Sequence, residues 1–347
     1  MRDLNLLVRS CVRDYAEPSA SVAAAGQEAP ELRLHANEVP FNAPYNRHLD
    51  AEPLQLCAEM GRLRGLRSDC VYPGSSCEDL TDQIIRLFCE PRQDNLVTVS
   101  PTSPLFARRA ALNGVECRSV PLGEDFALPV DALMAATDEH TKLILLCNPN
   151  NPTGTLFAWE TIECLLETFE GMVVVDESFA DFSRAESARR QIAKHPNLVV
   201  LESFSSAWGA AALRLAVAYA VPAVVAYLRR IGAPQPIGLP VLQQAQSLIK
   251  RRFEVDRWVN YLVEERNRMA DAINLLPICQ KVYPSAANFL FLRVKDAAAV
   301  HAYLLEQGIS VKHLGHLPYC QDCLRITVGL SNENARLLGA LRKYAHP

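Results

Sequence analysis

Six short runs rich in valine, leucine and isoleucine between residues 95 and 221 restrict the fold of this chain more than any other feature. They alternate with segments of helix length in which apolar residues recur at helical spacing. Strands that are apolar on both faces need cover on both sides, and such strands are typical of a mostly parallel sheet between two layers of helices. The sequence therefore predicts an α/β fold. The runs are NLVTVS (95–100), ECRSVPL (116–122), KLILLCN (142–148), MVVVDES (172–178), NLVVLES (197–203) and LAVAYAV (215–221).

Changes in pattern divide the chain into three parts. An amphipathic helix at the start and a small, polar, proline- and serine-bearing stretch make up an N-terminal arm (1–35). The six apolar runs belong to a large domain (36–240). A charged, helix-rich segment then leads into a small C-terminal α+β domain (241–347), against which the first helix could pack.

Charge, hydropathy and cysteine spacing exclude several classes of function. A net charge of -4 and an isoelectric point near 6.1 give no electrostatic reason to expect a nucleic-acid partner. No apolar run reaches the roughly 18–20 residues that a membrane span needs, and the N-terminus lacks the apolar core of a secretory signal, so we expect a cytoplasmic protein. The 11 cysteines are irregularly spaced, and Cys320 and Cys323 have no second pair at zinc-site spacing, which favours reduced thiols and no metal site.

Polar and small residues follow several of the expected strands, where ligands bind in parallel α/β sheets. Asp176 ends a purely apolar run, and the segment SFSSAWGAAALR brings hydroxyls and Arg214 to the same edge. CNPNNPTG (147–154) is rich in turn residues and amides, and YPGSSCED (72–79) opens a helix whose free N–H groups could hold a phosphate. Each segment alone is more often a cap or a turn. Their combination in this order indicates a ligand site.

These segments, taken in chain order, resemble the fold-type I pyridoxal-phosphate (PLP) aminotransferases of class I/II. Within that group the chain is most similar to histidinol-phosphate aminotransferase and threonine-phosphate decarboxylase. The resemblance implies a large domain with a mostly parallel seven-stranded sheet between helices, a smaller α+β domain, and a homodimer with active sites at the interface. It is carried by LHANEVPFNAP, RLFCEP, CNPNNPTGTL, VVVDESFADF, NLVVLESFS, VYPSAANFLFLR and CLRITVG.

The resemblance also assigns roles to individual residues. Asp176 matches the aspartate that pairs with the pyridine nitrogen of the cofactor, where a carboxylate keeps the ring protonated. Two residues match contacts to the cofactor phosphate. Two others match groups that recognise the substrate, and one of these is an arginine that binds the substrate carboxylate. The matching residues are Asn151 (ring hydroxyl), Ser205 and Arg214 (phosphate), and Arg325 and Asn37 (substrate).

Several positions depart from the family pattern around the same ring. Ser206 stands where the family has its Schiff-base lysine, and a hydroxyl cannot replace an amine in forming an imine. We therefore do not expect PLP to be held covalently; pyridoxamine phosphate (PMP) or no cofactor is the expectation. The other departures are Ser103 for a stacking aromatic, Phe179 for a tyrosine, His48 near the place of another tyrosine, and Gly74-Ser75-Ser76-Cys77 for the phosphate-binding Gly-Asn-Gly-Ser.

Three functions remain open from the sequence. The first is a divergent biosynthetic enzyme that acts on a small amino or keto acid through Ser206, Asp176 and Arg325, with PMP or without a cofactor. The second is a catalytically inactive partner or regulatory subunit, in a heteromer with an active aminotransferase. The third is an ordinary transaminase similar to histidinol-phosphate aminotransferase, which uses another amine; Lys312 is the candidate because its strand faces the active site in relatives.

Overall fold

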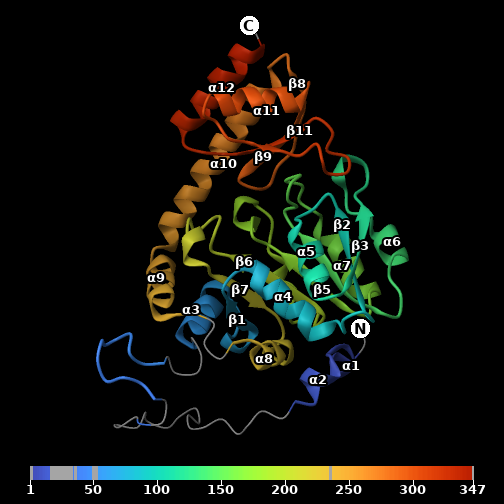
Figure 1. The fold of residues 1–347 in the computed structure, drawn as a ribbon, viewed down its shortest axis with the longest axis vertical. Helices are drawn as coiled ribbons and strands as arrows, with labels where there is room; N and C mark the ends of the chain where they lie inside the picture. Colours follow the sequence, from blue (N-terminus) through green and yellow to red (C-terminus); the bar gives the residue numbers. More distant parts are fainter. Residues whose placement is uncertain (1–2, 16–33, 35–36, 49–53, 234–236, 346–347) are drawn as a thin grey trace.

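The structure is a computed structural model that describes residues 3–15, 34, 37–48, 54–233 and 237–345. The described residues form a seven-stranded sheet and a four-stranded sheet in two domains, one above the other in Figure 1. The strand order of the larger sheet is β1-β7-β6-β5-β4-β2-β3. Its strands are β1 (Val71–Gly74), β2 (Asn95–Ser100), β3 (Glu116–Pro121), β4 (Thr141–Cys147), β5 (Met172–Asp176), β6 (Leu198–Ser203) and β7 (Ala216–Tyr219).

The six apolar runs all form strands of this sheet, so the predicted α/β fold is confirmed. Strands β3, β2, β4, β5 and β6 pair in parallel, whereas β7 is antiparallel to both of its neighbours, β6 and β1. The sequence did not predict β1, because Pro73 and Gly74 are poor strand formers. Proline is tolerated there since β1 lies at the edge of the sheet and pairs with β7 alone.

Helices cover both faces of the large sheet. Successive residues of β5 alternate between two cores: Val173 and Val175 belong to one, and Met172 and Val174 to the other. This alternation is the reason why the central strands are apolar at every position. The first core includes residues of α3 (Leu54–Arg64), α6 (Val130–Ala135) and α7 (Trp159–Thr168), and the second includes residues of α4 (Cys77–Phe88), α5 (Leu105–Leu112) and α8 (Pro222–Ile231).

The N-terminal residues form two short helices, α1 (Leu4–Leu7) and α2 (Ser10–Arg13). They pack against the large domain, where Leu7 and Val8 are buried in the same core as residues of α4 and α8. The Tyr227 hydroxyl of α8 donates a 2.8 Å hydrogen bond to the Asn5 side chain. The suggestion that the first helix packs against the small domain is therefore wrong, because its apolar side chains fill the groove beside α4 and α8.

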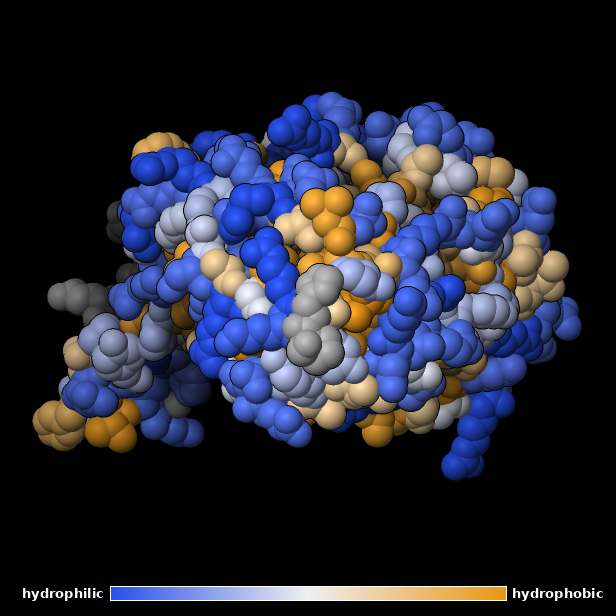
Figure 2. Space-filling model, turned by 90° about the horizontal axis from the view of Figure 1, so that it is seen from above, coloured by the Kyte–Doolittle hydropathy of each residue, from blue (hydrophilic) through white to orange (hydrophobic). Residues whose placement is uncertain are grey.

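Helices α9 (Leu239–Lys250) and α10 (Arg252–Asn274) lead into the small domain. Its antiparallel sheet has the order β10-β11-β9-β8 and carries one layer of helices (Figure 1). No helix within the described ranges is both long and apolar enough to span a membrane. Seen from above, the small-domain end is mostly hydrophilic (Figure 2). The remaining elements are β8 (Cys279–Tyr283), β9 (Phe289–Val294), α11 (Ala297–Glu306), β10 (Lys312–His313), β11 (Cys323–Thr327) and α12 (Ser331–Ala345).

The two faces of the small sheet differ in character. Leu292 and Leu324 are cross-strand partners on the face that packs against α10, α11 and α12. The next residue along each strand points to the opposite face, because side chains alternate in a strand. Arg293 and Arg325 therefore share the face turned toward the large domain, and Arg325 reaches Asn151 there. The strand period thus places cationic side chains between the two domains.

Candidate active site

The carboxyl ends of β4, β5 and β6 lie side by side at one edge of the large sheet. Cys147 and Asp176 are register partners at the ends of β4 and β5. The Asn148 amide donates a 2.9 Å hydrogen bond to the Asp176 carbonyl, and the Glu177 amide bonds to Leu201 on β6. Parallel strand order thus brings the segments that begin at residues 147, 176 and 203 to one edge, as the sequence indicated.

Asp176 is a buried carboxylate whose described hydrogen-bond donors are uncharged. Its Oδ1 accepts a 2.9 Å hydrogen bond from the Ser178 amide and another from the Ser178 hydroxyl. The Cys77 thiol lies 3.3 Å from that same hydroxyl. Burial raises the pKa of Asp176, and the hydrogen bonds from Ser178 oppose this rise. Since no described cation pairs with Asp176, the carboxyl is suited to a basic or protonated group of a ligand.

Arg325 joins the small domain to the end of β4. Its Nη1 donates a hydrogen bond to Oδ1 of Asn151, and its guanidinium lies 5.3 Å from the centre of the Phe289 ring. Partial burial lowers the pKa of Arg325, and no carboxylate of the described residues pairs with it. A half-buried guanidinium without a counter-ion is well suited to bind a ligand carboxylate.

The turn after β6 places Ser205 and Ser206 at the same edge. Phe204 and Trp208 stack with their ring centres 4.7 Å apart and anchor the turn in the core. The Ser205 amide bonds to the Ser203 hydroxyl, and the Ser206 carbonyl accepts from the Gly209 amide. Gly209 has a φ of 61°, which favours glycine at this position. The half-buried Ser206 is thus held by the backbone of a tight turn.

The residues expected around a phosphate take part in helix capping. Ser76 is the N-cap of α4 and accepts a 3.0 Å hydrogen bond from the Asp79 amide, while the Asp79 carboxylate accepts from the Ser75 amide. Ser103, at the position expected for a stacking aromatic, precedes Pro104, the N-cap residue of α5, and its hydroxyl accepts a long 3.4 Å hydrogen bond from the Leu105 amide. These contacts are those of ordinary helix caps. Arg214 is exposed in a left-handed conformation, with no described acidic partner.

Three other predicted residues lie in different surroundings. The Phe179 ring packs edge-on against Phe289, 5.3 Å away, between the domains. Asn37 is exposed in the segment 37–48, which Figure 1 shows extending from the body of the molecule beside α3. The His48 amide in that segment bonds to Glu38. The structure therefore brings Phe179 near Arg325 through Phe289, but it does not bring Asn37 or His48 to the site of the same chain.

All seven lysines of the chain lie within the described residues, and the structure records no contact of any of them with Ser206 or Asp176. Three form ion pairs away from these residues: Lys142 with Asp94, Lys194 with Glu163 and Lys281 with Asp125. Two lysines lie on the small-sheet face that is turned toward the large domain. Lys281 is opposite Arg293 and is paired with Asp125, whereas Lys312 is directly opposite Arg325 and has no described ion pair.

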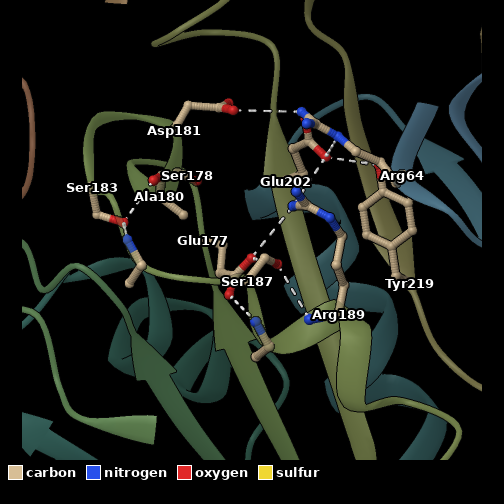
Figure 3. A network of polar contacts seen from close by, with 12 residues as sticks. Arg64, Glu177, Ser178, Ala180, Asp181, Ser183, Ser187, Arg189, Glu202 and Tyr219 are labelled. Carbon is tan, nitrogen blue, oxygen red and sulfur yellow. Dashed lines mark hydrogen bonds and ion pairs between the residues drawn. The ribbon is translucent and has the colours of Figure 1, made fainter.

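A buried ionic network surrounds Glu202, near the end of β6 (Figure 3). Glu202 accepts hydrogen bonds from Arg64 Nε at 3.1 Å, the Tyr219 hydroxyl at 2.8 Å and Trp208 Nε1 at 3.2 Å. Burial disfavours its charged form, but the cations of Arg64 and Arg189 outweigh burial and lower the pKa of Glu202 to about 2. The network therefore ties α3 to the turn that holds Ser206.

Glu177 forms the second carboxylate of this network. It accepts a 2.7 Å hydrogen bond from the Ala188 amide and another from the Ser187 hydroxyl, and Arg189 lies 3.6 Å away. Burial raises the pKa of Glu177 to about 7, against the opposing effect of Arg189. Sequence reasoning missed Glu177, Glu202 and Ser178. The signal was present in NLVVLES, where an acidic residue interrupts a wholly apolar strand.

We expect Glu177→Gln to change how stability depends on pH. A carboxyl whose pKa is about 7 in the folded protein, above its ordinary 4.5, stabilises the folded state at low pH, and this contribution is lost as the pH rises through about 7. Glutamine mimics the neutral form at every pH. The variant should therefore gain about 1–3 kcal/mol relative to the wild type between about pH 5 and pH 8, measured by urea unfolding. A difference that is independent of pH would contradict the raised pKa.

Comparison with known proteins agrees with this geometry. The family model "Aminotransferase class I and II" matches residues 15–341. Histidinol-phosphate aminotransferase of Bacteroides thetaiotaomicron is 40% identical over 311 residues, which are 90% of each chain. The same enzyme of Parabacteroides distasonis is 37% identical over 342 residues, 99% of each chain. The crystal structure of the histidinol-phosphate aminotransferase of Sinorhizobium meliloti in complex with pyridoxal-5'-phosphate superposes with a TM-score of 0.78 at 22% identity, and covers 86% of this chain and 83% of that one. The chain therefore belongs to the class I and II aminotransferase family.

Proposed function

We propose that this chain binds a small amino or keto acid between its two domains and acts on it without a covalently held cofactor. The observation that carries the proposal is Ser206 at the turn after β6, the position that we assign to the Schiff-base lysine of the family. A serine hydroxyl cannot form the imine that a lysine amine forms. Asp176 and Arg325, which would recognise a basic group and a carboxylate, remain in place at the same edge.

The described residues fit the non-covalent contacts of a vitamin B6 phosphate, but not its covalent attachment. Asp176 is buried without a described cation, which suits a protonated ring nitrogen. Asn151, Ser205 and Arg214 offer polar groups for the rest of such a molecule, whereas residue 206 offers no amine. PMP, when bound, supplies an amino group and an electron-accepting ring. A dissociable PMP is therefore compatible with the site, and covalent attachment of PLP to residue 206 is not.

In this proposal each residue of the site has a different role. Arg325 binds the substrate carboxylate, and its contact with Asn151 fixes the small domain over the sheet edge. Asp176 keeps the basic group of the bound ligand protonated, because pairing with a cation offsets the cost of burying the Asp176 carboxylate. Ser206 donates or accepts a hydrogen bond where the family places an amine. Phe179 and Phe289 pack at this junction and limit the access of water.

The second candidate function is ordinary transamination of histidinol phosphate or a similar amine. The comparisons favour it, because four relatives that cover at least 90% of the chain at 37–40% identity are named histidinol-phosphate aminotransferase. This candidate requires an amine other than residue 206. We assign it to Lys312, which lies directly opposite Arg325 and, unlike Lys281 on the same face, has no described ion pair. The two candidates differ in whether a lysine binds PLP covalently.

Incubation of the purified protein with PLP or PMP separates these candidates. For the first, we expect no absorbance that borohydride fixes to the polypeptide, and retention of PMP alone after gel filtration. For the second, borohydride should fix PLP to a peptide that contains Lys312, and Lys312→Met should abolish the labelling. Covalent labelling of the wild type would thus overturn the first candidate.

We expect Arg325→Gln to weaken the binding of small carboxylates. The substitution removes a charged donor that no described carboxylate neutralises, so the affinity for L-glutamate or 2-oxoglutarate should fall roughly 10- to 100-fold. Isothermal titration calorimetry measures the change. Arg108→Gln is the matched control, since Arg108 is 70% exposed and its ion pair is with Glu78 rather than with Asn151 or Asp176. Equal affinities for wild type and Arg325→Gln would contradict this role of Arg325.

We further expect a cytoplasmic homodimer. The segment 37–48 exposes Val39, Phe41 and Tyr45, with 62%, 74% and 59% of their surfaces accessible. Exposed apolar side chains on one extended segment favour a contact with a second subunit. Light scattering should give twice the mass of one chain. A monomer that forms a stable complex only with an active aminotransferase would instead support an inactive regulatory subunit.

A further inference from the structure

An open crevice lies where the loop after β3 meets the small domain, apart from Asp176, Ser206 and Arg325. Its volume is about 370 Å³, which is in the range of sites for small ligands. Figure 1 shows the end of β3 reaching up to the small domain at this place. The residues that matter are Glu124, Asp125 and Phe126 on the large-domain wall and Tyr283, Arg293 and Tyr319 on the small-domain wall.

Aromatic side chains form the floor of the crevice. Phe126 inserts from the large domain into the small sheet, with its ring centre 5.1 Å from that of Tyr283 and 5.4 Å from that of Phe291. Both contacts are edge-to-face, a favoured arrangement for aromatic pairs. Tyr319 is 51% exposed at the rim. The crevice therefore offers an aromatic surface on which a ligand ring can pack.

The two walls carry unpaired charges of opposite sign. Arg293 donates a 3.2 Å hydrogen bond to the Tyr319 carbonyl and also interacts with the Cys323 thiol, but no described carboxylate pairs with it. Glu124, on the facing wall, is exposed and forms no ion pair with a described cation. The nearby Asp125 is already paired with Lys281. A positive group and a negative group thus face one space across the domain boundary.

The backbone at the crevice is strained. Asp125, Phe126 and Tyr319 have positive φ angles of 50°, 62° and 62°. Left-handed conformations are uncommon for residues other than glycine and are outliers for a bulky side chain such as that of Phe126. Such strained residues cluster at ligand clamps, where the surrounding structure maintains them. Their occurrence on both walls of one crevice supports a binding role.

We propose that this crevice is a second binding site, for an aromatic amino acid. The ligand carboxylate bonds to Arg293, its ammonium group faces Glu124, and its ring packs beside Phe126, Tyr283 and Tyr319. The ligand bridges the domains and contacts Tyr319, which lies in the loop that leads into β11. Occupancy of the crevice therefore restrains the strand that carries Arg325.

Calorimetric titration with L-phenylalanine tests the site. We expect L-phenylalanine to bind at millimolar or lower concentrations. 3-Phenylpropionate lacks the ammonium group, phenethylamine lacks the carboxylate and L-alanine lacks the ring, so each should bind more weakly. Hydrogen exchange should slow in residues 122–126 and 314–322 when L-phenylalanine binds. Absence of binding to the wild type, or equal binding of all four compounds, would overturn the proposal.

Substitutions distinguish the crevice from the site at Arg325. Arg293→Gln should weaken L-phenylalanine binding about tenfold or more, and Glu124→Gln several-fold, while Arg325→Gln and the exposed control Arg108→Gln leave it unchanged. Loss of binding in Arg325→Gln alone would place the ligand at the other site and refute the proposal. Because Glu124 is exposed, its variant keeps the test valid if Arg293→Gln does not fold.

Discussion

Ser206→Lys should convert a protein that does not hold PLP covalently into one that does. The substitution places an amine at the turn after β6, the strand that pairs with β5, and β5 ends at the buried Asp176. An amine forms an imine with an aldehyde, whereas a hydroxyl does not. We expect the variant to gain a visible absorbance band with PLP that borohydride fixes to the peptide containing residue 206. Absorbance spectroscopy and peptide mass spectrometry measure the outcome.

Ser206→Arg is the matched control for this gain. It introduces a long cationic side chain at the same position, but arginine remains protonated and does not form the imine. Labelling of Ser206→Lys alone would show that the amine, rather than the positive charge, determines the attachment. If neither variant retains PLP, the pocket lacks the other contacts and the cofactor-free form of the proposed function is favoured. Equal labelling of wild type and Ser206→Lys would refute our assignment of residue 206.

Glu202→Ala should strongly destabilise the large domain. The substitution removes the carboxylate that Arg64 and Arg189 share. It leaves Arg64 only with Asp181 and Arg189 only with Glu177, each 3.6 Å away. It also removes the acceptor of the Tyr219 and Trp208 hydrogen bonds. Removing one partner of a buried ion pair costs about 3–5 kcal/mol. Urea unfolding should show a loss of free energy of this size.

Glu186→Ala provides the comparison for this loss. Glu186 pairs with Arg190, but both side chains are largely exposed, at 74% and 66%. Exposed pairs contribute only about 0–1 kcal/mol because water and salt screen them. A similar, small loss in both variants would mean that the Glu202 network is solvated rather than buried.

Much of the fold could be predicted from short-range patterns. The apolar runs gave strands β2 to β7 because burial on both faces requires an apolar side chain at every position. β1 was not predicted, because its four residues include Pro73 and Gly74, which disfavour a strand. They form one here because β7 pairs with them. The packing of α1 and α2 was also missed, because Leu7 and Val8 would fit any apolar groove and the sequence does not specify which one.

The same distinction between predicted and unpredicted features applies to the candidate site. The sequence by itself determined that residue 206 is a serine, that Asp176 ends a buried strand and that Arg325 lies in a small-domain strand. Only the tertiary structure decided that Ser178 and Cys77 surround Asp176, that Arg325 reaches Asn151, and that Arg64 meets Glu202 across 138 residues. Strand and helix periods depend on neighbouring residues, so they can be recognised in the sequence. Ion pairs and crevices depend on how distant segments dock, and that docking is set by the packing of the whole chain.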